Sequence, residues 1–345
     1  DYPGVLSPKH TGLPGRPIMF RSEHPLRARL LGGDSAVRLQ KRSHLVLDGF
    51  HVAPRAGTYL YAAHCQHLVI RTCRFEGARG SYTATRFIEC RDILLRDNVF
   101  TRLLSTSQGA VLTGNMLQAD QCHRLVLEGN TLGRAGHSPA HLRECKQLVV
   151  RRNLFCAKWG RGFETFNATP MLFEENVITE EVDSGGSADS RGKVLAIDGI
   201  FRRNLVIRNY DAALASNSYI YREGTPAWVL QDSRLYNNTL YRNHSYAWII
   251  TARSGDLSTV SGNIWKNNIF CENDPLGDFR ALRLGQLDGL ESSRQATGGE
   301  LLGAEGVTVG GPGGRIPVVG HQTDAAEPAA VARSDQLVHQ VRVVQ

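Results

Sequence analysis

Five short segments of the chain carry polar side chains at one shared position, and the types of these side chains could do chemistry. Aligned on a repeated cysteine that only the fifth segment lacks, the position holds Tyr61, Arg86, Gln118, His141 and Glu164. A neighbouring position adds Asp120 and Arg143. Because every second residue of a β-strand points to the same face, stacked copies of these segments would form two adjacent polar columns. The sequence therefore predicts a polar surface in the middle of the chain.

These side chains match the demands of β-elimination at a uronic acid. That reaction needs a base for the proton beside the carboxylate, a cation that neutralises the carboxylate, and an acid for the leaving oxygen. Tyr61 could be the acid. The base would be His141, His137 or Lys158. The available cations are Arg86, Arg143, Lys158 and Arg161. We predict that the catalytic residues are His137, His141, Arg143, Lys158 and Arg161.

Aromatic side chains beside the columns suit a sugar ring. Tyr59 and Tyr61 would provide a stacking platform, because an aromatic ring combines an apolar face with a polar hydroxyl. The predicted substrate-binding residues are Tyr59, Tyr61, Arg86, Gln118, Asp120, Trp159 and Glu164. A polar face that is merely solvated remains the other interpretation of the same pattern.

Hydrolysis is a second chemistry that the same surface leaves open. It needs two carboxylates across the scissile bond, and Asp120 and Glu164 are the candidates. They would lie two layers apart, roughly 10 Å, which is wide even for an inverting pair. The residues therefore favour elimination over hydrolysis.

A calcium ion could supply part of the positive charge in an elimination. The acidic side chains available for it are Glu174, Glu175, Glu180, Glu181, Asp183 and Asp189. The segment EEVDSGGSADS lacks the ligand spacing of an EF-hand, so an ordinary acidic loop explains it better. We assign no metal ligand and no cofactor from the sequence, and calcium stays open.

A repeat must supply the elements that position these residues. Cys122-x-x-Leu125-Val126-Leu127-x-x-Asn130 returns 23 residues later as Cys145-x-x-Leu148-Val149-Val150-x-x-Asn153. Such a short unit cannot bury its own apolar face and must stack on copies of itself. Nine copies are visible, with short β-type runs between Gly, Asn and polar corners and with no helix-length amphipathic pattern between them.

Two residue types recur at fixed places in the repeat. Cys65, Cys90, Cys122 and Cys145 share one position, and we expect them to stack as buried thiols rather than to pair. A recurrent asparagine occupies a corner at positions 98, 130, 153, 176, 204, 238 and 268. Asparagine tolerates the left-handed conformation, and a stacked amide can bond to its neighbour along the ladder. We expect both sets to be structural.

Composition bounds the class of partner. The chain has 345 residues, 41% of them hydrophobic, and a net charge of +7. Its basic balance favours an anionic partner, and the scattered arginines favour an anionic polysaccharide over nucleic acid. No run of 18 apolar residues occurs, so no membrane span is predicted. The first ten residues lack the apolar core of a signal peptide, so the chain is either intracellular or has lost a leader.

The repeat L-V-L-x-x-N-x-(L/F), returning every 23 or more residues, resembles the right-handed parallel β-helix of the pectate-lyase-like superfamily. The opening segment 12–33 resembles the first coil of secreted polysaccharide-acting β-helix proteins. The resemblance implies an all-β, single-stranded right-handed parallel β-helix of about nine to eleven coils over residues 1–275. The Gly-rich residues 276–345 are expected to pack on this helix or to cap it.

The resemblance implies a carbohydrate-active protein, secreted or periplasmic. Because the superfamily hosts lyases, hydrolases, epimerases and non-catalytic adhesins, the fold does not choose among these activities. The residues favour a lyase that cleaves a uronate-containing polysaccharide by β-elimination. A glycoside hydrolase or epimerase on the same fold and a non-catalytic glycan-binding or structural β-helix are the alternatives. The sequence does not determine the oligomeric state.

Overall fold

A computed structural model provides the structure of the chain. It describes residues 1–55, 57–77, 83–101, 114–135, 138–157, 163–166, 169–180, 192–193, 196–197, 199–207, 214–217, 230–241, 248–252, 260–261, 264–271, 282–286, 304–305 and 308–310.

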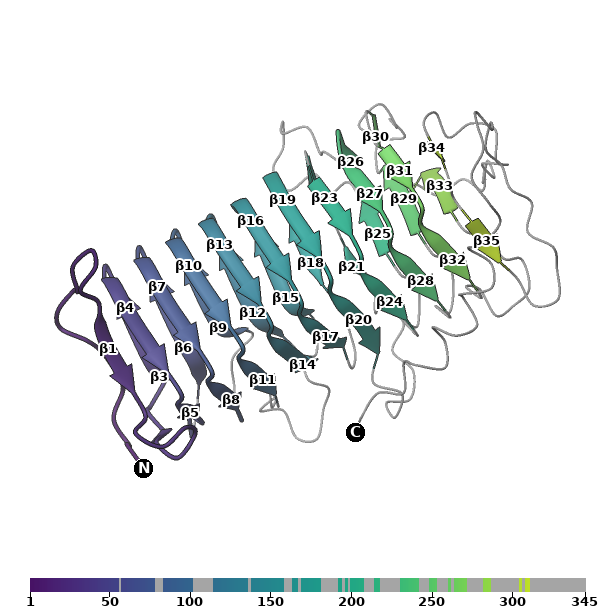
Figure 1. The fold of residues 1–345 in the computed structure, drawn as a ribbon. Coiled ribbons are helices and arrows are strands. Elements are labelled where there is room, and N and C mark those ends of the chain that lie inside the picture. Colours follow the sequence, from purple (N-terminus) through teal and green to yellow (C-terminus); the bar gives the residue numbers. More distant parts are fainter. Residues whose placement is uncertain are drawn as a thin grey trace.

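Three parallel sheets run the length of the described part, and each of the first ten coils adds one strand to each sheet (Figure 1). Sheet I contains β1 (Ile18–Arg21), β4 (Ser43–Asp48), β7 (Gln66–Arg71), β10 (Arg91–Arg96), β13 (His123–Glu128), β16 (Lys146–Arg151), β19 (Thr169–Glu174), β23 (Gly199–Arg202), β27 (Arg234–Tyr236), β31 (Ile264–Lys266) and β34 (Ala304–Glu305).

Sheet II contains β2 (Arg29–Leu30), β5 (His51–Val52), β8 (Arg74–Glu76), β11 (Val99–Thr101), β14 (Thr131–Ala135), β17 (Leu154–Ala157), β20 (Val177–Glu180), β24 (Leu205–Ile207), β28 (Thr239–Tyr241), β32 (Ile269–Cys271) and β35 (Thr308–Gly310). Sheet III contains β3 (Ser35–Gln40), β6 (Thr58–Ala63), β9 (Thr83–Ile88), β12 (Asn115–Asp120), β15 (Ser138–Arg143), β18 (Glu164–Phe166), β21 (Gly192–Lys193), β25 (Leu214–Asn217), β29 (Trp248–Ala252) and β33 (Leu282–Gln286). A small fourth sheet joins β22 (Ala196–Ile197), β26 (Leu230–Gln231) and β30 (Val260–Ser261).

The strands of each sheet pair in parallel with the strands of the preceding and following coils. No helix occurs within the described ranges, and so none there is long and apolar enough to cross a membrane. The predicted all-β parallel β-helix is therefore confirmed.

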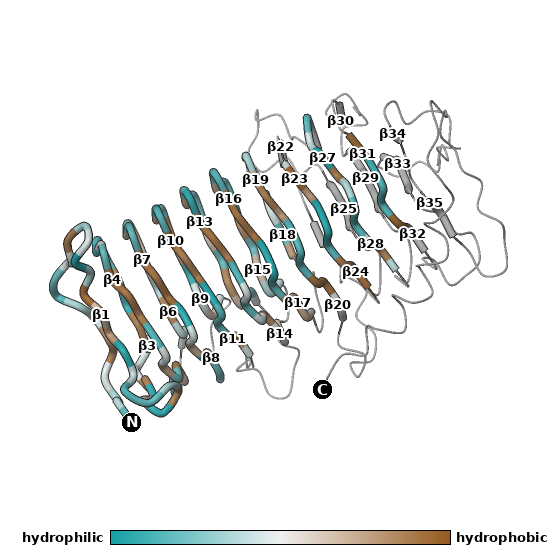
Figure 2. Tube along the Cα trace, in the orientation of Figure 1, coloured by the Kyte–Doolittle hydropathy of each residue, from teal (hydrophilic) through white to brown (hydrophobic). Residues whose placement is uncertain are grey.

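The interior is built from the alternation of each strand. In β13, Leu125 and Leu127 point inward and are buried, while Val126 between them is half-buried on the outer face. Figure 2 shows the resulting apolar band along the strands of sheet I from β4 to β19. Aromatic rings stack inside as well, with Phe75 and Phe100 4.5 Å apart between ring centroids. Full burial of one such leucine or phenylalanine contributes about 1.5–3 kcal/mol.

The corner asparagines form a continuous hydrogen-bonded ladder. Asn153 donates its side-chain amide to Asn176 Oδ1 at 3.0 Å and to the Leu127 carbonyl at 2.9 Å. Its own Oδ1 accepts from the backbone and side-chain N–H groups of Asn130, at 2.9 and 3.0 Å. The same pattern links Asn98, Asn130, Asn153, Asn176, Asn204, Asn238 and Asn268. The predicted structural role is confirmed.

The left-handed conformation predicted for these asparagines is wrong, because the residue before each of them adopts it instead. Asp97, Arg152 and Glu175 have φ values of 54°, 55° and 55°. The preceding residue makes the sharp turn, and the asparagine then enters the next strand with its amide directed inward. The asparagine is therefore selected for its hydrogen bonds and not for its backbone freedom.

The cysteine column is also confirmed. Cys65, Cys90, Cys122 and Cys145 are buried, form no disulfide, and donate to backbone carbonyls of their own and preceding coils. The hydrogen bond with the Cys122 thiol and burial of the group raise the pKa of Cys90 to about 12. The Cys90 thiol is therefore a scaffold group that stays protonated at neutral pH.

The sheets continue past residue 275. β33 pairs with β29 of the preceding coil, and β34 and β35 extend sheets I and II. The predicted division of the chain at residue 275 stays a prediction, because most of residues 276–345 lie outside the described ranges.

Candidate functional site

The outer face of sheet III carries the two polar columns that the sequence predicts. Strand pairing places Tyr61 beside Arg86, Arg86 beside Gln118, Gln118 beside His141, and His141 beside Glu164. The neighbouring column places Asp120 beside Arg143. The predicted register of these residues is therefore correct, and the columns cross β6, β9, β12, β15 and β18.

Small and apolar inward residues hold these strands in place. In β12, Leu117 and Ala119 are fully buried, and in β15 Ala140 and Leu142 take the same two places. Because strand residues alternate between faces, the polar residues between them must point outward. The columns are thus a consequence of the packing of the core.

A histidine–carboxylate pair lies at the C-terminal end of the first column. His141 Nδ1 is 3.1 Å from Glu164 Oε2. The Glu164 side chain is completely buried, and the His141 side chain is 12% exposed. A buried carboxylate at this distance fixes the orientation of an imidazole ring and stabilises the imidazolium that forms when the ring takes up a proton. The geometry is suited to a histidine that accepts a proton.

Asp120 is the centre of the second column. Its carboxylate lies 3.3 Å from Arg86 Nη2 and 3.0 Å from Arg143 Nε. Gln118 Nε2 donates to both of its oxygens, at 3.2 and 3.0 Å. The Asp120 side chain is only 5% exposed, whereas that of Arg86 is 42% exposed. The buried carboxylate therefore holds two guanidinium groups in fixed positions at the surface.

Positive charge exceeds negative charge over this surface. Arg86 and Arg143 share the single carboxylate of Asp120. One coil before Tyr61, the exposed Arg38 continues the first column, and its guanidinium lies 5.9 Å from the Tyr61 ring centroid. An anionic ligand would meet a cationic surface here.

The architecture is that of a parallel β-helix. No family model matches the chain, and no curated protein matches it. Among solved structures, an alginate lyase from Paenibacillus sp. strain FPU-7 is 16% identical over 82% of this chain and 87% of its own, with a TM-score of 0.43. A mannuronic acid specific polysaccharide family 6 lyase from human gut microbiota is 12% identical, covering 81% and 73%, with a TM-score of 0.41.

A third similar structure is the A-module of a mannuronan C-5 epimerase from Azotobacter vinelandii. It is 13% identical over 89% of this chain and 82% of its own, with a TM-score of 0.38. Identities this low and TM-scores below 0.5 carry no argument about the activity of the β-helix. The site must be judged on its own geometry.

The structure corrects the prediction for Tyr59. Its side chain is completely buried, its ring centroid lies 5.8 Å from that of Phe75, and its hydroxyl donates to the Thr101 carbonyl at 2.6 Å. The ring is directed toward sheet II instead of standing out from sheet III. Tyr59 therefore cannot act as a platform for a sugar, and Tyr61, which is half-buried on the outer column, is the tyrosine that remains.

Tyr61 and His141 are too far apart to act on one bond. Strand pairing separates them by three coils, about 14 Å at the usual spacing of strands. The expectation that Tyr61 supplies the acid while His141 supplies the base is therefore wrong. Tyr61 stays a predicted substrate-binding residue at a distance along the column.

Four of the predicted residues cannot be placed. His137, Lys158, Trp159 and Arg161 lie outside the described residues. Their catalytic and binding roles stay predictions.

The acidic residues named for calcium are not gathered into a site where the structure describes them. Glu174 binds Arg202 and Arg203, and Glu175 also binds Arg203. Glu181, Asp183 and Asp189 lie outside the described ranges, as does the side chain of Glu180. Among the described residues, no three His, Cys, Asp or Glu side chains are close enough to hold a metal ion. Calcium stays a prediction.

Sequence analysis missed three residues of this surface. Thr83 and Asn115 donate to Gln118 Oε1, at 2.8 and 3.3 Å, and fix the amide that reaches Asp120. Arg38 extends the first column by one coil. All three could have been found by extending the alignment: Arg38 falls in register with Tyr61, and Thr83 and Asn115 share the first place of their strands.

Proposed function

We propose that the outer face of sheet III binds a uronate-containing polysaccharide and cleaves it by β-elimination. The observation that carries the proposal is the pairing of His141 with the buried Glu164, because His141 precedes Arg143 by two residues on the same face of β15. A proton acceptor and an anion-binding group are thereby on the same strand, β15. These are the two groups that elimination beside a carboxylate requires.

The roles follow from the positions. Arg143 would bind the uronate carboxylate, and Arg86 would bind that of a neighbouring sugar, with both guanidinium groups held by Asp120. Charge neutralisation makes the C5 proton of the sugar more acidic. His141 takes this proton, the C4–O bond breaks, and a C4–C5 double bond forms. The imidazolium, stabilised by Glu164, then returns the proton to the leaving oxygen, so that no other acid is consumed.

Hydrolysis fits the same surface less well. The two carboxylates that it would use belong to different columns and lie two coils apart, about 10 Å at the usual strand spacing. Asp120 is occupied by two arginines and a glutamine, and Glu164 by His141. Neither carboxylate faces the other across a space for a sugar.

Glycan binding without catalysis is the second candidate function, and one observation favours it. Carboxylates that each hold two or more arginines also occur on sheet I, at Asp48, Glu128 and Glu174. The Asp120 cluster alone is therefore an ordinary feature of this scaffold. Histidine–carboxylate pairs also occur elsewhere, at His51–Glu76, His64–Glu89 and, on sheet I, His67–Asp92, but the carboxylates of these pairs are 19–52% exposed. The completely buried carboxylate of Glu164 distinguishes the His141–Glu164 pair.

The nature of the product separates these functions. The protein is incubated with polygalacturonate, polymannuronate, polyguluronate and glycosaminoglycans, and unsaturated ends are measured by their ultraviolet absorbance while reducing ends are measured in parallel. Elimination predicts both signals in equal amounts. Reducing ends without the absorbance would identify a hydrolase, and binding to a polymer without either signal would identify a binding protein. Either result would overturn the proposed lyase activity.

A further inference from the structure

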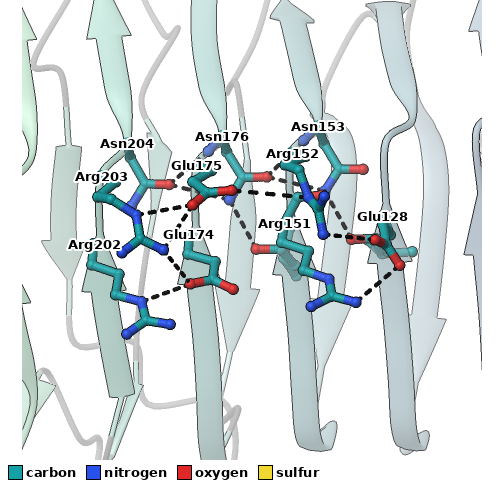
Figure 3. A network of polar contacts seen from close by, with 12 residues as sticks. Glu128, Arg151, Arg152, Asn153, Glu174, Glu175, Asn176, Arg202, Arg203 and Asn204 are labelled. Carbon is teal, nitrogen blue, oxygen red and sulfur yellow. Dashed lines mark hydrogen bonds and ion pairs between the residues drawn. The ribbon is translucent and has the colours of Figure 1, made fainter.

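A row of arginines follows the edge of sheet I that lies farthest from sheet III. Its members come from five of the eight coils between β1 and β23 and occupy the last position of a sheet I strand or the corner that follows; the other three coils place Asp48, Glu128 and Glu174 there. This arginine row consists of Arg21, Arg71, Arg96, Arg151, Arg152, Arg202 and Arg203. Figure 3 shows the part of the row that contains Arg151, Arg152, Arg202 and Arg203. The length of a sheet I strand, about 20 Å for six residues, separates the row from the columns of sheet III.

Buried carboxylates fix these guanidinium groups from below. Glu128 holds Arg96 Nη2 at 3.0 Å, Arg151 Nη2 at 3.1 Å and Arg152 Nη2 at 2.9 Å. Its side chain is 11% exposed, whereas those of the three arginines are 34–55% exposed. An arginine has five N–H donors, so a guanidinium that donates one hydrogen bond to a buried carboxylate has further donors available to a ligand.

The arrangement repeats at both ends of the row. Asp48 and Glu174 are also buried, and each holds two arginines. The pairs are Asp48 with Arg21 and Arg71, and Glu174 with Arg202 and Arg203, at 2.6–3.2 Å. Exposed side chains of the row are thus positioned in advance, which lowers the entropy lost on binding.

The exposed layer of this edge is positive. Seven guanidinium groups lie in it, while Asp48, Glu128 and Glu174 are covered. The exposed carboxylates at the same corner are Asp97 and Glu175, and Glu175 pairs with Arg203 at 2.7 Å. A ligand that approaches from solvent therefore meets more positive than negative groups, in a straight line along the stacked coils.

We propose that the arginine row is a second binding track, one that holds an acidic polysaccharide along the β-helix without cleaving it. Five coils would each offer one or two guanidinium groups to the carboxylate or sulfate groups of an extended polymer, and the rigid stacking would keep these contacts in line. Single-stranded nucleic acid suits the row less well, because its binding sites interleave aromatic side chains with basic ones. The choice of a polysaccharide rests on the proposed function of sheet III, but the row itself does not.

Binding is measured with fluorescently labelled polygalacturonate, polymannuronate and dextran sulfate, with neutral dextran and a single-stranded DNA oligonucleotide for comparison. All measurements use the full chain carrying His141→Ala, so that no polymer is consumed. The test variant adds Arg96→Gln, Arg152→Gln and Arg203→Gln, which leaves Arg151 on Glu128 and Arg202 on Glu174. The control variant adds Lys9→Gln, Arg16→Gln and Arg55→Gln, three exposed basic residues elsewhere with the same change in net charge.

We expect the test variant to bind the acidic polymers about tenfold more weakly than the parent, which corresponds to about 1.4 kcal/mol, and the control to change by less than about twofold. The loss should shrink as salt is added, because exposed charges are screened. If dextran sulfate binds more tightly than the uronate polymers and the test variant loses this binding about tenfold, the ligand is a sulfated polymer and the binding role of the arginine row is supported. No binding by the parent, equal losses in test and control, or DNA bound as tightly as the glycans would overturn the proposal.

Cleavage of short uronate oligosaccharides separates this proposal from the lyase. In a chain with His141 intact, the three arginine substitutions should leave that rate unchanged, since short substrates occupy sheet III alone. Unchanged cleavage with unchanged polymer binding would contradict the binding role of the arginine row and support the proposed lyase activity. If the protein forms no product and the test variant loses polymer binding, the result would support the binding role of the arginine row and contradict the proposed lyase activity.

Discussion

At the scale of single residues, the buried Glu164 decides what His141 can do. His141 is tied by its Nδ1 to a completely buried carboxylate 3.1 Å away, whereas the exposed His64 and His67 pair with carboxylates that are themselves partly exposed. Glu164 has an inward-packed neighbour, Phe163, which is fully buried against Phe173 at 4.7 Å between ring centroids. The core thus fixes the carboxylate, and the carboxylate fixes the ring.

The substitution Glu164→Gln tests this dependence. It keeps the shape of the side chain and removes the charge that stabilises the imidazolium, so we expect kcat to fall by about 10²–10⁴-fold and KM to change by less than about threefold. Steady-state rates on a uronate polymer measure both. An unchanged kcat would show that the pair is structural only.

Substitution of Asp120 should instead affect binding. Asp120→Asn removes the charge that holds Arg86 and Arg143, so both guanidinium groups gain freedom and lose their common orientation. We expect a higher KM, by about three- to tenfold, with a smaller change in kcat. Gln121→Ala, at an exposed corner one residue later, is the matched control and should leave both constants unchanged.

At the scale of elements, the asparagine ladder and the ion pairs hold one coil on the next. Each asparagine serves the backbone of one coil and the side chain of another. The periodic sequence revealed the ladder, because residues 98, 130, 153 and 176 fall at one place of the repeat. It did not reveal which residue makes the turn, because that place holds Arg152, Glu175 and Arg203 as well as Gly129, Asn237 and Asn267, so residue type does not mark it in every coil.

Asn153→Ala is expected to destabilise the stack strongly. It removes the partner of the buried Asn130 N–H and leaves the Leu127 carbonyl without its donor. Each buried polar group left unsatisfied costs about 1–3 kcal/mol, so the free energy of unfolding should fall by at least about 2 kcal/mol. Urea denaturation gives this value, and Gln66→Ala, an exposed residue of sheet I, should change it by less than about 0.5 kcal/mol. Equal effects of both substitutions would contradict the role of the ladder.

Acid should weaken the contacts between coils. Burial of Asp48 opposes its ionisation, but hydrogen bonds from Thr72, Arg71 and Arg21 outweigh it and lower its pKa. The pKa of Glu128 is lowered likewise against burial, by hydrogen bonds from Arg96 and Arg151. A carboxyl with a lowered folded pKa stabilises the protein above its unfolded pKa of about 4, and this stability disappears as the pH falls through the folded pKa.

Thermal unfolding between pH 7 and pH 3 measures this loss. The midpoint should fall once the pH drops below about 4.5, and Asp48→Asn should reduce the slope of that fall. A midpoint independent of pH over this range would show that the carboxylates contribute nothing to the stack.

At the scale of the whole molecule, sequence periodicity predicted the scaffold of the β-helix more completely than it predicted the candidate site. The stacking of coils, the inward leucines, the thiol column and the register of the polar columns all follow from residues that recur at one place of the repeat. Tyr59 was misplaced because a strict alternation of faces fails at the start of β6, where its ring is directed to sheet II. Residues between the coils, such as 102–113 and 158–162, have no periodic signal, so alignment could not position them.

The central claim is that His141, held by Glu164, performs an elimination on the outer face of sheet III. The most direct measurement is the ultraviolet absorbance of unsaturated product from uronate polymers, compared among the wild type, His141→Ala and the control His67→Ala, an exposed histidine of sheet I. The account predicts absorbance from the wild type and the control, and a rate at least about 100-fold lower from His141→Ala. Absorbance that persists in His141→Ala, or that is lost equally in both variants, would contradict it.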